Sequence, residues 1–210
     1  MPIASIIITT KNEEANIANC LQSIKTQTYP QDKIEIIVVD NNSQDKTKEI
    51  ALTFTDKVYN HGHERSAQRN FGMINIAKGK YVMFVDGDMV LSEELIEEAV
   101  NSMESNSNLV GLYVPLRWVG DNWIIKGKGF EREFYDASCL DAVRFIKREI
   151  IVKIGGFDER LYAAEDWDLD KRIRQEGKVT SIRSIMYHYE DKAVNLKEHL
   201  QKNQYYLKNI

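Results

Sequence analysis

The sequence predicts an α/β fold in which helices cover both faces of a mostly parallel central sheet. Three nearly continuous apolar runs, at residues 3–9, 34–39 and 81–85, carry this prediction. Strands that are apolar on both faces are typical of a parallel sheet buried between helices. Segments with helical spacing separate the runs. The loops that follow the strands should therefore meet at one edge of the sheet, where ligands bind in such folds.

Composition limits both the size of the fold and the class of partner. The 210 residues are 43% hydrophobic and 29% charged, which suits one domain with at most a small appendage. A formal net charge of −4 argues against a nucleic-acid-binding protein, which needs a basic face. Cys20 and Cys139 match neither a zinc nor a disulfide spacing, so a reducing, cytoplasmic location is expected. Neither a signal peptide nor a membrane-spanning apolar run is recognisable.

The N-terminal half is predicted to alternate strands with helices. Apolar residues at helical spacing and capping residues fix the elements between the three strands. These elements are a helix over 17–24, a second helix to about residue 53 capped by Ser43 or Asp45, a short strand at 57–59, and a helix over 64–78 that stops at Gly79.

The strand at 81–85 ends in Asp86-Gly87-Asp88, the centre of the predicted site. Two aspartates one residue apart suit a hard divalent cation, although an isolated motif of this kind also fits an ordinary acidic turn. Glu13 and Asp40 follow the other strands and should converge with these aspartates. The edge has neither a glycine-rich dinucleotide loop nor a Gly-Lys-Ser/Thr phosphate loop. Since carboxylates repel a diphosphate, we predict a nucleotide-diphosphate site that is bridged by a metal.

The C-terminal half contains less regular patterns. Ser92 should cap a helix over 93–103 with an acidic first turn, and 109–118 should form one extended strand. Residues 117–133 interleave aromatic residues with glycines and match neither period, so they form either a sugar platform or acceptor lid, or a cover for the edge of the core. The remaining expected elements are a strand at 143–146, a short helix over 148–153, a turn at 155–158, and a helix over 165–175 with three carboxylates in its first turn.

Six short motifs together resemble a known family. They are Thr-Lys-Asn-Glu at 10–13, Val-Val-Asp-Asn-Asn-Ser at 38–43, Arg-Asn-Phe-Gly at 69–72, Val-Asp-Gly-Asp at 85–88, Gly-Gly-Phe-Asp-Glu at 155–159, and Glu-Asp-Trp-Asp-Leu at 165–169. In this order they resemble the GT-A glycosyltransferases of the inverting family 2, over nearly the whole chain to about Tyr189. The resemblance implies a Rossmann-like nucleotide-diphospho-sugar transferase fold over residues 1–190, with a nucleotide-binding half at 1–90 and an acceptor-binding half at 91–190.

The same resemblance implies an activity and its residues. A hexosyl or N-acetylhexosaminyl group would pass, with inversion, from a UDP- or GDP-sugar to a hydroxyl of a glycan, lipid-linked or small-molecule acceptor. Asp166 would be the catalytic base. Asp88 of the DXD motif would bind Mn²⁺ or Mg²⁺ together with His188, whose alternative is an ordinary histidine at a strand end. The substrate-binding residues would be Thr10, Glu13, Asp40, Arg69, Asp86, Glu165 and Trp167, with Glu13 and Asp40 at the base and ribose and Arg69 at the base or diphosphate.

Three other functions fit parts of the pattern. The intact motifs at 86–88 and 165–166 disfavour a non-catalytic domain that binds a nucleotide or sugar. The acidic loop at 10–14 disfavours a nucleotidyltransferase, which needs a basic, glycine-rich loop there. A retaining glycosyltransferase of the same fold differs in the stereochemistry of its product.

Residues 191–210 are predicted to form a basic amphipathic helix. It packs back on the domain, or lies on a membrane surface near a lipid-linked acceptor, or leads into membrane helices further along. The second interpretation would place the protein at the cytoplasmic face of a membrane.

Overall fold

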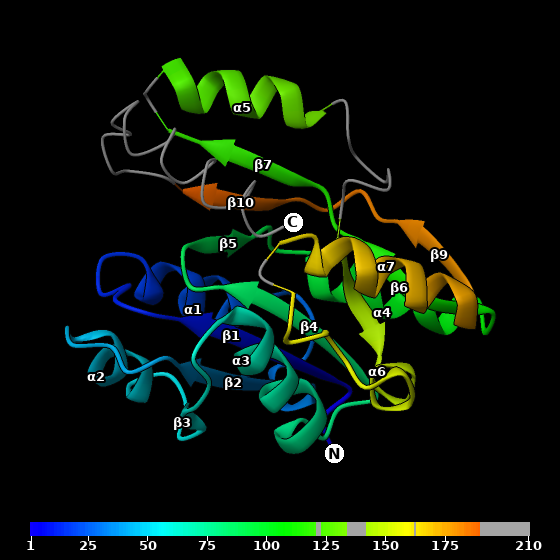
Figure 1. Cartoon of the computed structure of the whole chain (residues 1–210), viewed down its shortest axis with the longest axis horizontal. Helices are drawn as coiled ribbons and strands as arrows, with labels where there is room; N and C mark the ends of the chain where they lie inside the picture. Colours follow the sequence, from blue (N-terminus) through cyan, green and yellow to red (C-terminus); the bar gives the residue numbers. More distant parts are fainter. Residues whose placement is uncertain (121–122, 134–141, 162, 190–210) are drawn as a thin grey trace.

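The computed structural model describes residues 1–120, 123–133, 142–161 and 163–189, and a seven-stranded sheet runs through them (Figure 1). The strand order is β3-β2-β1-β4-β8-β6-β9. β1 pairs in parallel with β2 and β4, whereas β8 runs antiparallel to both β4 and β6. The predicted, mostly parallel sheet is therefore confirmed. Its strands are β1 (Ala4–Thr10), β2 (Ile34–Asp40), β3 (Val58–Asn60), β4 (Tyr81–Asp86), β6 (Leu109–Tyr113), β8 (Val143–Lys147) and β9 (Lys178–Ser181).

Helices cover both faces of this sheet, and each face has its own apolar cluster. Alternate residues of a strand point to opposite faces, so Ile6 and Ile8 of β1 join one cluster while Ile7 joins the other. The first cluster includes α1 (Ile17–Lys25), α2 (Thr47–Leu52) and α4 (Leu95–Ser105). The second includes the turn at Phe71–Ile76 after α3 (Arg65–Asn70), together with α6 (Arg148–Ile154) and α7 (Glu165–Glu176).

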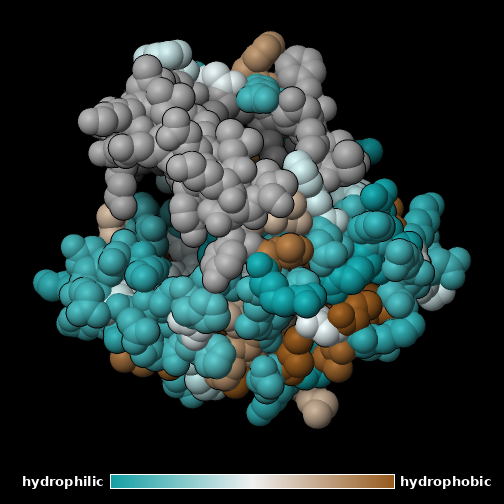
Figure 2. Space-filling model, in the orientation of Figure 1, coloured by the Kyte–Doolittle hydropathy of each residue, from teal (hydrophilic) through white to brown (hydrophobic). Residues whose placement is uncertain are grey.

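Most described side chains on the face shown in Figure 2 are hydrophilic, as expected when the apolar residues fill two internal clusters. Within the described part of the chain, no helix combines the length and apolar character needed to cross a membrane. The predicted helix at 191–210 lies outside the described residues.

A second, three-stranded sheet lies next to the first and differs from the prediction. Its order is β5-β10-β7, formed by β5 (Met89–Leu91), β10 (Met186–Tyr189) and β7 (Leu116–Val119). β5 was not predicted. The single strand expected at 109–118 is wrong, because the chain leaves the large sheet after β6 and enters the small sheet as β7. Pro115 lies at this change, where it cannot donate a backbone hydrogen bond to a continuous ladder.

Two helix boundaries also differ from the prediction. The helix over 64–78 is α3 followed by a π-helical turn at Phe71–Ile76, so it ends before Gly79. Gly72 lies in this turn, and a Cβ there would be 2.5 Å from Ile7 Cγ2, so the close approach to β1 requires glycine. Ser92 is not the N-cap of α4, because Glu94 occupies that position. The Ser92 hydroxyl instead accepts a hydrogen bond from the Ile185 amide.

The glycine-rich segment is partly helical. Residues 117–133 contain the end of β7 and the helix α5 (Trp123–Glu133), which lies over β7 in Figure 1. A short 3₁₀ helix at Gln31–Lys33 precedes β2. The predicted turn at 155–158 is confirmed, since Gly155 and Gly156 have φ values of 79° and 71°.

Glu35 connects three segments at the edge of the sheet opposite the site. Its carboxylate accepts hydrogen bonds from the Ser5 hydroxyl, the Lys57 ammonium at 2.6 Å and the Lys78 amide at 2.9 Å. Burial by itself would raise the pKa of Glu35, but these hydrogen bonds outweigh burial and hold the pKa below its usual value. The Ser5 hydroxyl in turn accepts from the Gly79 amide at 2.9 Å. Glu35 therefore holds the backbone in place just before β4 begins.

We expect Glu35→Gln to lower the free energy of unfolding by about 2 kcal/mol at pH 7, because it removes a buried charge from three donors. Since the folded state lowers the pKa of Glu35, the contribution is present above the ordinary glutamate pKa of about 4.3 and is lost as the pH falls further. Urea unfolding at pH 7 and pH 3.5 measures both effects. The matched control is Glu104→Gln, which changes an exposed ion pair with Lys80, keeps an oxygen for the Tyr81 hydroxyl, and should cost about 0.5 kcal/mol or less. Equal losses in the two variants would contradict this role of Glu35.

Candidate functional site

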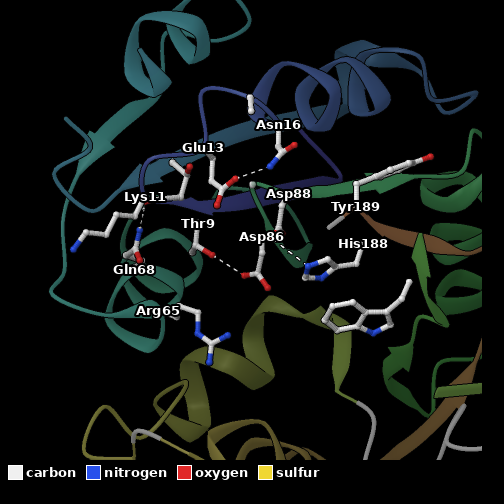
Figure 3. A pocket seen from close by; sticks show the side chains of 14 residues that line it. Thr9, Lys11, Glu13, Asn16, Arg65, Gln68, Asp86, Asp88, His188 and Tyr189 are labelled. Atoms are coloured by element: carbon white, nitrogen blue, oxygen red, sulfur yellow. Dashed lines mark hydrogen bonds and ion pairs between the residues drawn. The ribbon is translucent and has the colours of Figure 1, made fainter. Parts of the chain in front are cut away.

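A cavity of about 420 Å³ opens where β1 and β4 end (Figure 3). The parallel register places Thr10 opposite Asp40 and Thr9 opposite Asp86, which brings the loops after three strands together as predicted. The predicted site residues that line the cavity are Thr10, Glu13, Asp86, Asp88 and His188. It is also lined by residues for which the sequence predicts no role, among them Thr9, Lys11, Asn16, Arg65, Gln68 and Trp118.

The other predicted site residues are not among the described residues that line this cavity. Asp40 is fully buried, and its carboxylate accepts from the Ser43 amide at 2.8 Å and the Ser43 hydroxyl at 2.5 Å. It therefore shapes the loop after β2, and its contact with a nucleotide stays a prediction. The remaining residues in this group are Arg69 of α3 and Glu165, Asp166 and Trp167 of α7.

Backbone amides of the loop after β1 are tied to the loop after β2. The Asn12 amide donates to the Ser43 hydroxyl and the Glu13 amide to the Thr47 hydroxyl, both at 2.8 Å. In the opposite direction, the Lys46 amide donates to Glu14 Oε2 at 3.0 Å. The wall of the cavity around Glu13 is thus fixed before any ligand binds.

Asp86 lies at the end of β4 in a strongly cationic environment. The Thr9 hydroxyl donates to Asp86 Oδ1 at 3.0 Å, and Arg69 donates to the same oxygen at 2.9 Å. Burial alone would raise the pKa of Asp86, but the charges of Arg69, Arg144 and Arg65 outweigh burial and hold the pKa well below its usual range. Asp86 is therefore ionised at neutral pH.

Arg69 connects Asp86 to the beginning of α7. Its side chain is only 1% exposed, and its NH1 group lies 3.3 Å from Asp166 Oδ1. The guanidinium carbon lies 4.6 Å from the centre of the Phe84 ring, a cation–π contact. Burial would lower the pKa of Arg69, but the charges of Asp86 and Asp166 outweigh burial and raise it, so the arginine stays charged.

The first turn of α7 presents carboxylates with different surroundings. The side chain of Asp166 is 34% exposed, whereas Glu165 is nearly buried and lies 3.3 Å from Arg65. Burial, together with the charge of Asp166, raises the pKa of Glu165. Asp168 pairs with Arg172 one turn later at 2.5 Å, which agrees with its expected role in stabilising the helix. Trp167 is half exposed.

Asp88 and His188 lie together although 100 residues separate them. Asp88 Oδ2 is 3.2 Å from His188 Nε2. Two further atoms, Asp88 Oδ1 and His188 Nδ1, are buried and have no hydrogen-bond partner among the described residues. The imidazole stacks on Trp118 with 4.1 Å between the ring centres. A carboxylate and an imidazole with unused polar atoms fit a divalent metal such as Mn²⁺ or Mg²⁺.

The pair makes up only part of a metal shell. No cluster of three or more metal-ligating side chains occurs in residues 1–120, 123–133, 142–161 and 163–189. A metal at this position would need further ligands, which Mn²⁺ and Mg²⁺ commonly take from water and substrate phosphates.

Some lining residues had a signal in the sequence and others had none. Arg65 lies four residues before Arg69 on α3, so helical spacing indicates that the two share a face. Thr9 is adjacent to Thr10, but only the register with β4 places its hydroxyl on Asp86. Trp118 faces His188 because β7 pairs with β10, and no local pattern predicts that pairing.

Comparison with known proteins adds independent findings. The sequence model of a family described as "Glycosyl transferase family 2" matches residues 5–157, and one described as "Glycosyltransferase like family 2" matches residues 121–208. The chain is 29% identical over 197 residues to Glycosyltransferase AglE of Haloferax volcanii, which covers 84% of this chain and 63% of that protein. It is 28% identical to Poly(ribitol-phosphate) beta-glucosyltransferase of Bacillus spizizenii, which covers 84% of this chain and 26% of that protein. The chain thus spans less than two thirds of the length of each of these relatives.

Solved structures resemble the whole arrangement of elements. The crystal structure of S. aureus TarS 1–349 in complex with UDP-GlcNAc has a TM-score of 0.73 at 21% identity, covering 93% of this chain and 60% of that one. Mannosyltransferase PcManGT from Pyrobaculum calidifontis, in complex with GDP-Man and Mn²⁺, has a TM-score of 0.74 at 20% identity, covering 99% of this chain and 62% of that one. At these identities the likeness concerns the fold.

Proposed function

This chain belongs to glycosyl transferase family 2 and has the GT-A fold, and from this premise we propose that it transfers a sugar, with inversion, from a UDP- or GDP-sugar to an acceptor hydroxyl. The observation that carries the proposal is the pairing of Asp88 with His188 beside a cavity of about 420 Å³. This arrangement offers metal ligands, fixed loops and carboxylates at one edge of the sheet. Because carboxylates repel a diphosphate, a nucleotide diphosphate can approach these carboxylates only with a metal ion bound between them.

The donor is proposed to lie along the loop after β1. Glu13 offers a carboxylate to the N–H groups of a base or to ribose hydroxyls, and Thr10 Oγ1 is buried without a hydrogen-bond partner in the described part of the chain. Asp40 would act here mainly by shaping the adjacent loop. The solved structures with UDP-GlcNAc and with GDP-Man support a nucleotide sugar as the class of donor.

Asp88 and His188 would hold Mn²⁺ or Mg²⁺ next to the diphosphate. When bound, such an ion neutralises the charge that develops on the departing nucleoside diphosphate. Asp86 would add a fixed negative charge that attracts the ion. Its hydrogen bonds to Thr9 and Arg69 keep the carboxylate in one orientation. Trp118 stacks on His188 and thereby restricts the orientation of the imidazole.

Asp166 would accept the proton of the acceptor hydroxyl. Its partly exposed carboxylate lies at the start of α7 and uses one oxygen for Arg69. As the hydroxyl oxygen forms a bond to the anomeric carbon, the bond from that carbon to the diphosphate oxygen breaks, and the proton passes to Asp166. Attack from the face opposite the leaving group inverts the anomeric carbon in one step. We propose a glycan or a lipid-linked molecule as the acceptor.

The proposal is tested with UDP-glucose, UDP-GlcNAc, UDP-galactose and GDP-mannose. We expect one of these donors, with Mn²⁺ or Mg²⁺, to raise Tm by about 5 °C near saturation, because a ligand that binds only the folded state stabilises it. The same donor without the metal is the control and should give a much smaller shift. Hydrolysis of each donor is measured in parallel. The absence of both a shift and hydrolysis for all four donors with either metal would contradict the proposed function.

A further inference from the structure

Two arginines one helical turn apart on α3 have very different surroundings. Arg65 and Arg69 lie on the same face of the helix, as residues four apart do. The side chain of Arg65 is 50% exposed and is one of those that line the cavity in Figure 3. The side chain of Arg69 is 1% exposed. The guanidinium of Arg65 is therefore accessible to solvent and to a ligand, whereas that of Arg69 is buried.

Arg69 makes its contacts within the protein, and its Nε–H alone is buried without a hydrogen-bond partner among the described residues. Its NH2 group lies 2.9 Å and 3.3 Å from the two oxygens of Asp86, and its NH1 group lies 3.3 Å from Asp166 Oδ1. The guanidinium carbon also lies 4.6 Å and 5.2 Å from the centres of the Phe84 and Phe157 rings, which contact each other with 5.3 Å between their centres. Because the side chain is 1% exposed and two carboxylates take up its NH1 and NH2 groups, little of the guanidinium is within reach of a donor molecule.

We infer that Arg69 is a positioning residue that holds Asp166 and Asp86 in their working orientations, and that Arg65, rather than Arg69, contacts the donor. The inference rests on the proposed function, because it assigns Asp166 the role of base. The planar fork of arginine donates to the two carboxylates from separate nitrogens in fixed directions, whereas a lysine offers one compact charge on a flexible stem. Arg69 thus fixes the distance between the end of β4 and the start of α7.

The residue next to Arg69 strengthens this connection. Asn70 donates from Nδ2 to the Phe157 carbonyl at 2.9 Å and accepts from the Phe157 amide at 2.8 Å. A Cβ at Gly156 would lie 2.2 Å from Asn70 Oδ1, so the backbone before α7 approaches α3 as closely as glycine allows. Arg69 and Asn70 therefore attach the loop and the helix that carry Asp166 to the same turn of α3.

The matched substitutions Arg69→Lys and Arg65→Lys test the inference, each in the full chain. The probes are UDP-GlcNAc, UDP-glucose, UDP-galactose and GDP-mannose with Mn²⁺ or Mg²⁺, with water as acceptor; calorimetry gives donor Kd and hydrolysis gives kcat. We expect Arg69→Lys to lower kcat about 100-fold with Kd changed by less than about twofold, because small misplacements of a reacting group have effects of this size. We expect Arg65→Lys to raise Kd about tenfold with kcat changed by less than about threefold, since a lost bidentate contact with phosphate weakens binding.

Three outcomes overturn the inference. If Arg69→Lys raises Kd as much as Arg65→Lys while kcat is unchanged, Arg69 contacts the donor and the inference fails alone. If the wild-type protein neither binds nor hydrolyses any of the four donors, the proposed function fails and the inference with it. Should Arg69→Lys not fold, as judged by circular dichroism, Phe157→Leu replaces it. That variant keeps the charge of Arg69 and removes its contact with the Phe157 ring, so it should lower kcat and leave Kd unchanged; a normal kcat in folded Phe157→Leu would also overturn the inference.

Discussion

Replacing Asp166 with asparagine is expected to lower the rate of sugar transfer about 10³-fold, because a positioned base contributes on that scale and an amide cannot accept the proton. The affinity for the donor should change by less than about twofold, since asparagine keeps an oxygen for Arg69 and Asp166 is not among the described residues that line the donor cavity. Stopped assays with the donor identified by thermal shift measure the rate, and calorimetry measures the affinity.

The matched control for this variant is Asp168→Asn on the same turn of α7. Asp168 pairs with Arg172 along the helix and has the same chemistry as Asp166, but a structural role. We expect a small loss of stability and a rate within about threefold of wild type, in line with the modest value of an i, i+4 ion pair. Near-normal turnover in Asp166→Asn, or an equally large loss in Asp168→Asn, would contradict the assignment of the base.

Replacing Asp88 with asparagine is expected to remove the metal dependence of donor binding. The neutral amide keeps the shape of the side chain but lowers the attraction for a divalent ion, which prefers charged oxygen ligands. His188 would remain as one neutral ligand. The stabilisation by donor with Mn²⁺, about 5 °C in the wild type, should fall to the value measured without metal. Titration of Mn²⁺ followed by electron paramagnetic resonance gives a readout that does not depend on turnover.

Asp158→Asn is the control for the lost charge. Asp158 pairs with Arg160, whose side chain is 89% exposed, and it is not among the described residues that line the cavity. This variant should bind Mn²⁺ and donor as the wild type does. A wild-type Mn²⁺ affinity in Asp88→Asn would show that the ion is held elsewhere, and the proposal for Asp88 and His188 would then be withdrawn.

The sequence was most informative where structure depends on local periodicity. The apolar runs of β1, β2 and β4 predicted a sheet buried on both faces, and alternate residues of each strand do enter the two clusters. The register of three parallel strands then brings the ends of β1, β2 and β4 together, as the order of elements implied. The helix predicted at 165–175 is α7, because its acidic first turn and apolar spacing lie within one segment.

The sequence was least informative where residues far apart have to pair. Pro115 interrupts the strand expected at 109–118, and β5 has only three residues, which are too few to show a strand pattern in the sequence. The expected cap at Ser92 failed because its hydroxyl binds the Ile185 amide, a partner more than ninety residues away. Such pairings depend on packing between elements, which outweighs local propensity.

The sequence by itself determined the chemistry that this protein has available: the acidic groups at the ends of its strands, the fold that gathers them, and the family to which it belongs. Only the tertiary structure decided which contacts each of these groups makes. It places Asp40 in a loop turn, brings His188 to Asp88, and sets Arg69 between Asp86 and Asp166. The physical reason is that a local pattern specifies which face of an element is apolar, whereas the orientation of a polar side chain depends on the charges and rings that distant segments bring to it.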